Sequence, residues 1–72
     1  MINISERLKQ LRKEKGVTQK AMAIYLGVAE TTYQQFEYSN FRPGLEKLVA
    51  LADYFNVSMD YLIGRSDNRR GL

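Results

Sequence analysis

Few side chains in this sequence of 72 residues could carry out covalent chemistry. The chain contains no His and no Cys, so it lacks a histidine base, a thiol nucleophile, the usual nitrogen and sulfur ligands of zinc, and a disulfide. The remaining candidates, Lys20, Glu30 and Glu37, do not supply a nucleophile, a base and an orienting group together. We therefore expect neither an enzyme nor a metal or cofactor site.

The size of the chain also limits what it can bind. A domain this small uses nearly all its apolar side chains for its own core, so we expect no pocket for a small-molecule ligand. No apolar run is long enough to cross a membrane, and the charges of Glu6 and Arg7 exclude a signal peptide at the start. These features predict a cytoplasmic module that binds a partner through its surface.

The basic residues are concentrated near the start of the chain. Residues 1–27 carry a net charge of +4, residues 28–60 one of −3, and residues 61–72 one of +2. Such a separation suggests a polyanionic partner such as nucleic acid, and an ordinary solvated basic helix face explains it equally well. The charge pattern alone leaves both interpretations open.

Helices must position any binding residues, because the apolar spacing has a helical period and no strand-like alternation occurs. Ile4, Leu8 and Leu11, for example, recur at the spacing of one helix face. Residues suited to capping stand where the helices should begin (Asn3 or Ser5, Thr18, Ser58) and end (Gly16, Gly27, Asn56, Gly64). The sequence predicts an all-α chain with helices over residues 4–15, 19–26, 29–37, 45–55 and 59–63.

The order of these parts is similar to that of a known family. The motifs are Arg-x-x-x-Gly-x-Thr-Gln at 12–19, Leu-Gly-Val at 26–28, Phe-Glu at 36–37, Pro43, and Val-Ser-x-Asp-x-Leu at 57–62. Over residues 5–64 the chain resembles the lambda-repressor/Cro-like helix-turn-helix family of bacteria and phages, often called the XRE family. The resemblance implies a compact five-helix domain over residues 1–64, with the helix-turn-helix formed by the second and third helices. A polar, flexible tail is expected over residues 65–72.

The resemblance implies that the third helix lies in the major groove of double-stranded DNA. Its apolar residues share one side, and the polar side chains opposite can bond or touch base edges. The implied base-reading residues are Glu30, Thr31, Gln34 and Gln35. A solvated helix face is the alternative interpretation of the same polar residues.

The third helix departs from the family pattern in several ways. It contains no Lys or Arg, Ala29 replaces the usual Ser or Thr cap, and Ser39 and Asn40 stand where a Gly commonly closes the helix. Backbone phosphates must therefore be bound from elsewhere. The expected residues are Gln19, Lys20, Asn40 and Arg42. Basic residues of the first helix are assigned long-range steering only.

The resemblance also implies an internal ion pair and a dimer. Arg12 and Glu37 match an Arg and a Glu that pair in relatives, so we expect a partly buried ion pair between the first and third helices. Members of the family commonly pair through their C-terminal end, where four residues exceed the needs of a small core. These possible homodimer contacts are Tyr54, Met59, Tyr61 and Ile63.

The sequence supports two interpretations of function. The leading one is a small repressor-like transcriptional regulator that binds a DNA operator sequence-specifically as a homodimer. The alternative is a protein-interaction or antitoxin-like helix-turn-helix module, because Ile24 and Tyr25 are predicted to point outward as scattered surface residues or as a protein-contact patch.

Overall fold

Helix boundaries follow the capping residues that the sequence places between the apolar segments. The computed structural model describes residues 2–39 and 41–70. In this part of the chain the helices are α1 (Ile4–Lys15), α2 (Gln19–Leu26), α3 (Glu30–Tyr38), α4 (Leu45–Phe55) and α5 (Met59–Leu62). None of the described residues forms a strand, which confirms the all-α prediction. The third helix begins and ends one residue later than predicted, and the fifth ends one residue earlier.

Side-chain caps begin three of the helices. Asn3, rather than Ser5, caps α1 by accepting a hydrogen bond from the Glu6 N–H at 2.9 Å, and Ser5 is buried. Thr18 accepts from the third residue of α2, and Ser58 does the same for α5, each at 3.0 Å. These bonds satisfy N–H groups that have no partner inside the helix.

The core draws on every helix. Each contributes one of the largest fully buried side chains: Leu8, Met22, Tyr33, Leu51 and Leu62, in order from α1 to α5. Because the helices are short, none could bury an apolar face alone, and the shared core makes their packing interdependent. The positions of α2 and α3 therefore depend on the whole domain.

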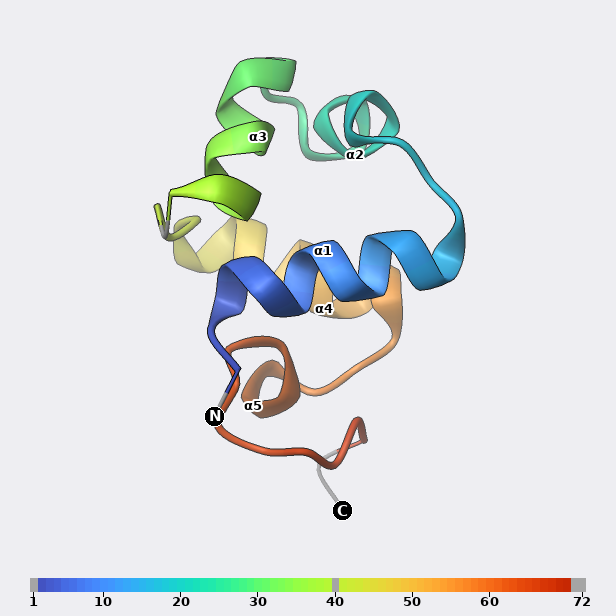
Figure 1. Ribbon diagram of the computed structural model, residues 1–72, viewed down its shortest axis with the longest axis vertical. Helices are drawn as coiled ribbons and strands as arrows, with labels where there is room; N and C mark the ends of the chain where they lie inside the picture. Colours follow the sequence, from blue (N-terminus) through green and yellow to red (C-terminus); the bar gives the residue numbers. More distant parts are fainter. Residues whose placement is uncertain (1, 40, 71–72) are drawn as a thin grey trace.

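Along the longest axis of the molecule, α2 and α3 lie at one end and α5 lies at the other (Figure 1). Between them lie α1 and α4, and α3 packs against both α2 and α1. No described helix is long and apolar enough to cross a membrane. Even α1, with 12 residues, spans only about 18 Å at the helical rise.

Residues 65–70, which the sequence predicts to be a flexible tail, fold back onto the domain. Arg69 contacts both carboxylate oxygens of Glu14 at 2.9 Å, and Arg70 donates to the Asn56 side chain at 3.1 Å. Charge-assisted bonds of this kind hold the described part of the segment against α1 and the end of α4. Its flexibility and the domain boundary at residue 64 stay predictions.

Candidate nucleic-acid interface

A bidentate ion pair joins α1 to α3. Arg12 donates from Nε to Glu37 Oε2 at 2.7 Å and from Nη2 to Oε1 at 3.2 Å, and its Nη1 donates to the Val17 carbonyl at 3.0 Å. The Glu37 side chain is fully buried, and that of Arg12 is 13% exposed. This is the partly buried pair expected from the sequence, and it sets the position of α3 relative to α1.

The ion pair controls the protonation of Glu37. Burial raises the pKa of this carboxyl group, but hydrogen bonds from Arg12 and Gln19 and the charge of Arg12 outweigh burial and lower the pKa below its ordinary value. The hydrogen bond to Glu37 likewise raises the pKa of Arg12. The buried pair therefore stays ionised at neutral pH.

Gln19, expected to contact the DNA backbone, is occupied inside the protein. Its Nε2 donates to Glu37 Oε1 at 3.2 Å and to the Tyr38 hydroxyl at 2.8 Å, and its Oε1 accepts from Gln34 Nε2 at 3.4 Å. A glutamine amide has two N–H groups, and both are used here. The side chain thus lacks a donor for a phosphate in this arrangement. Its bonds hold α2 against α3 and orient Gln34, a role that the sequence did not predict.

The outward face of α3 is polar and carries no cation. Glu30, Thr31 and Gln35 are exposed, and Gln34 is half-buried beside Gln19. No side chain caps the start of this helix, where Ala29 stands in the capping position. The residues expected to read bases therefore lie on one helix, and a side-chain bond to α2 holds Gln34.

The residues expected to bind the DNA backbone are placed differently from one another. Lys20 lies exposed in the first turn of α2, and Arg42 is exposed in the segment between α3 and α4. Asn40, which with Gln19 completes the set of four, lies outside the described residues. Two of the expected contacts are thus accessible on the surface that flanks α3.

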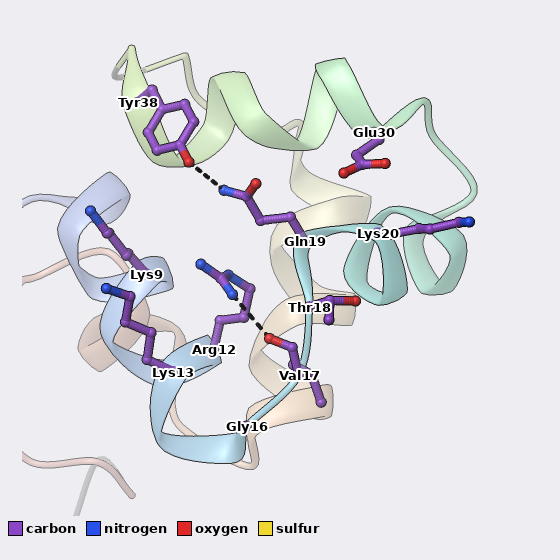
Figure 2. A pocket seen from close by; sticks show the side chains of 10 residues that line it. All are labelled: Lys9, Arg12, Lys13, Gly16, Val17, Thr18, Gln19, Lys20, Glu30 and Tyr38. Atoms are coloured by element: carbon purple, nitrogen blue, oxygen red, sulfur yellow. Dashed lines mark hydrogen bonds between the residues drawn. The ribbon is translucent and has the colours of Figure 1, made fainter.

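A hollow of about 520 Å³ opens between α1, the turn before α2, and the end of α3. We call it the basic hollow, because Lys9, Arg12, Lys13 and Lys20 line it together with Gln19, Tyr38 and a single carboxylate, Glu30. Figure 2 shows Lys9 and Lys13 side by side on α1, with Gln19 and Tyr38 nearby and Lys20 on the α2 side. Sequence reasoning missed this site because its residues come from three helices.

One of the expected dimer contacts is wrong. Tyr61 is only 4% exposed and belongs to the core. The Arg7 guanidinium lies 3.7 Å from the centroid of its ring, and that of Arg69 lies 5.3 Å away. The ring of Tyr61 on the short α5 is therefore buried in the core, with the guanidinium groups of Arg7 and Arg69 over it. Tyr54, Met59 and Ile63 are half-buried and pack against the core.

Several large apolar residues are exposed, as the sequence predicts for two of them. Ile24 is 71% and Tyr25 46% exposed on α2. Tyr25 is nevertheless anchored, because its hydroxyl donates to the Ala50 carbonyl at 3.2 Å and its ring lies 4.6 Å from that of Tyr54. Leu45, the first residue of α4, is also exposed.

A short α2, a turn at Gly27 and a polar α3 packed onto α1 define a helix-turn-helix domain. The family model described as Helix-turn-helix matches residues 8–62. The chain belongs to the lambda-repressor-like, or XRE, helix-turn-helix family.

Among curated proteins, the chain is similar to two from Bacillus subtilis (strain 168). They are the uncharacterized HTH-type transcriptional regulator YobD, 40% identical over 63 residues, and the HTH-type transcriptional regulator AnsR, 40% identical over 65 residues. The alignments cover 88% and 90% of this chain and 56% of each relative. The chain thus spans little more than half the length of these relatives.

Among solved structures, the chain is similar to the P22 c2 repressor protein, which was crystallised in complex with a synthetic operator. The TM-score is 0.82 at 30% sequence identity, and the match covers 92% of this chain and 100% of that chain. The likeness therefore extends over all of that chain, beyond the two helices of the motif.

Proposed function

We propose that this chain is the sequence-specific DNA-binding domain of a repressor-like transcriptional regulator. The observation that carries the proposal is the placement of α3: its polar face is exposed, while the ion pair of Arg12 with Glu37 and the bonds of Gln19 hold it against α1 and α2. A helix held rigidly in this way can present hydrogen-bonding groups to the major groove in a defined register.

The proposed roles divide between specificity and affinity. Glu30, Thr31, Gln34 and Gln35 read base edges, because their donors and acceptors match those of the major groove. Lys20, Arg42 and Asn40 hold the phosphate backbone, which carries no sequence information. Gln19 contributes to the contact with the DNA phosphates through the N–H groups at the start of α2. Its side chain positions Gln34.

A homodimer is part of the proposal. One helix of 9 residues covers only a few base pairs, so a useful operator requires two copies related by a two-fold axis. The proposed contacts are the half-buried Tyr54 near the end of α4, and Met59 and Ile63 at α5. We further infer a cytoplasmic, non-catalytic protein whose binding needs no metal, cofactor or small-molecule ligand.

Titration of the full chain against genomic fragments, including the DNA upstream of its own gene, tests the proposal. Because each neutralised phosphate adds roughly 0.9 to the slope of log K against log salt, affinity should fall steeply as salt increases. One fragment should bind more tightly than the rest at the same salt concentration. Absence of binding at low salt by a chain that circular dichroism shows to be folded would contradict the proposal.

A protein-interaction module is the second candidate, favoured by the exposure of Ile24 and Tyr25 on α2. An apolar contact surface gives no obligatory salt slope, so the same titration separates the two functions. Replacing Ile24 with Ser should leave DNA affinity unchanged if DNA is the partner. A loss of DNA binding in this variant would place Ile24 in the DNA interface instead.

A further inference from the structure

Two lysines of α1 have no role in the proposed contacts of α2 and α3 with DNA. Lys9 and Lys13 lie one turn apart, are exposed, and line the basic hollow. Within residues 2–39 and 41–70, neither forms an ion pair. Lys15, on the same helix, lies outside the hollow. Its Nζ donates to the Tyr54 carbonyl at 3.3 Å and lies 4.7 Å from the centroid of the Tyr54 ring.

The Tyr38 hydroxyl adds a directed donor to this pair of cations. It accepts the hydrogen bond from Gln19 Nε2 at 2.8 Å, so its own O–H remains able to donate to a ligand in the hollow. The residue is 64% exposed and lines the same hollow as the two lysines. Two ammonium groups and one hydroxyl therefore surround a space large enough for a phosphodiester group and its water.

We propose that Lys9, Lys13 and Tyr38 bind a backbone phosphate of duplex DNA directly, an inference that rests on the proposed function. The first helix then contributes a contact of its own, in place of the long-range steering expected from the sequence. A phosphate is the ligand that fits this chemistry, since it accepts hydrogen bonds on several oxygens and carries the opposite charge. Glu30, on the other side of the hollow, disfavours a second anion there.

The proposed contact is linked to the reading face through a chain of hydrogen bonds. Tyr38 is bonded to Gln19, and Gln19 accepts from Gln34, one of the residues proposed to read bases. A phosphate that fixes the Tyr38 hydroxyl also restricts the orientation of Gln19 and hence of Gln34. Occupation of the basic hollow therefore helps to set the register of α3 in the groove.

Charge removal at matched positions of α1 tests the contact. The double variant Lys9→Gln/Lys13→Gln should lower the salt slope of binding to a mixed-sequence DNA duplex by about 0.9, the amount for one neutralised phosphate. Lys15→Gln removes a charge from the same helix outside the hollow and should leave the slope unchanged. An equal decrease in slope per charge removed, in the double variant and in Lys15→Gln, overturns the proposal, because the lysines would then act by general attraction.

Tyr38→Phe provides a second test without any change of charge. Loss of the hydroxyl should weaken binding to every duplex by about tenfold, as expected for one hydrogen bond to a charged group. Because Tyr38 and the lysines are exposed, thermal unfolding should show that all variants remain folded. Wild-type affinity in Tyr38→Phe overturns the role of the hydroxyl.

The outcomes separate this inference from the proposed function. If the wild-type chain shows no salt-dependent DNA binding, both are wrong. If the wild type binds and the hollow variants behave like Lys15→Gln, the DNA-binding function stands and the phosphate site in the hollow is wrong.

Discussion

The side chain of Glu37 holds α3 against both α1 and α2. Its carboxylate is fully buried and accepts hydrogen bonds from Arg12 on α1 and from Gln19 on α2. A buried charge is costly unless it is paired, so the three helices must keep these partners in place. The proposed reading face is thus positioned by a residue that cannot itself touch DNA.

Removing one partner of this pair should strongly destabilise the domain. We expect Arg12→Met to lower the free energy of unfolding by about 3 kcal/mol, because Glu37 would remain buried without its cation. The double variant Arg12→Met/Glu37→Met should recover much of that loss, since no unpaired charge remains. Chemical denaturation of the three proteins measures both effects, and additive losses in the double variant would contradict this account.

The same pair predicts a pH dependence. The pKa of Glu37 is lower in the folded protein than its ordinary value of 4.5, so its contribution to stability is present above that value and is lost as the pH falls through the folded pKa. The difference in unfolding free energy between wild type and Arg12→Met should therefore shrink as the pH falls, because the unpaired, buried Glu37 of Arg12→Met takes up its proton at a higher pH than the paired Glu37 of the wild type. Denaturation midpoints measured from pH 7 down to pH 3 check the sign. A difference that stays constant would show that Glu37 titrates alike in both proteins.

Replacing Gln35 and replacing Arg42 should weaken DNA binding in different ways. Gln35→Ala removes an exposed amide from the reading face, and we expect a loss of about 1 to 3 kcal/mol on the best operator with relaxed preference at one base pair. Arg42→Ala should weaken all duplexes nearly equally and lower the salt slope by about one. Titrations on operator and scrambled duplexes at several salt concentrations distinguish them. Equal losses on both duplexes for Gln35→Ala would mean that α3 does not read the sequence.

The helices are joined by turns whose backbone conformations select particular residues. Gly16, Gly27 and Gly64 have positive φ, and Asn56 adopts the same left-handed region after α4. The surroundings of these residues differ. A side chain at Gly16 would meet no atom nearby, whereas one at Gly64 would collide with the backbone carbonyl of Ile2. The turn after α5 is therefore also a packing contact with the start of the chain.

Alanine at these two glycines separates conformational strain from steric overlap. Gly16→Ala should cost about 1 kcal/mol, the penalty for a left-handed residue with a side chain. Gly64→Ala should cost a further 1 to 3 kcal/mol, roughly, because the backbone of Ile2 must also move. Thermal and chemical unfolding of both variants gives the comparison. Equal losses would show that the segment around Ile2 yields without cost.

The folded molecule concentrates its positive charge at one end more strongly than the sequence suggests. Arg69 pairs with Glu14 on α1, which partly neutralises the basic C-terminal segment, and Arg70 is bonded to the uncharged side chain of Asn56. Lys9, Lys13 and Lys20 of the N-terminal segment instead line the basic hollow, beside α2 and α3. The helix-turn-helix end therefore carries the positive charge that a polyanion would meet first.

A two-fold dimer makes a prediction about operator geometry. Half-sites should be centred about one DNA turn apart, roughly 10 base pairs, or a multiple of that spacing. Inserting about five base pairs between them turns one half-site to the opposite side of the duplex, and affinity should then fall to that of a single half-site. Titration of a spacing series measures this. Constant affinity across the series would mean that the copies bind independently.

Much of the fold could be predicted because its determinants are close together in the chain. Thr18 is a good example: it caps α2 through the N–H of a residue three positions away, so sequence spacing alone predicts the start of that helix. The family resemblance supplied the ion pair of Arg12 with Glu37. The prediction of Tyr61 as a dimer contact was wrong, because counting apolar residues near the C-terminus does not show which of them a short helix buries.

Local patterns in the sequence thus account for the number, order and limits of the helices, since capping and helical periodicity act over a few residues. The geometry of the candidate site depends on contacts across the chain. Gln19 meets Tyr38, 19 residues away, and Arg69 meets Glu14, 55 residues away. Such pairs form only after the helices pack around a shared core, and no spacing rule specifies which exposed side chains that packing brings together. The basic hollow, and the network that orients Gln34, therefore became visible only in the folded molecule.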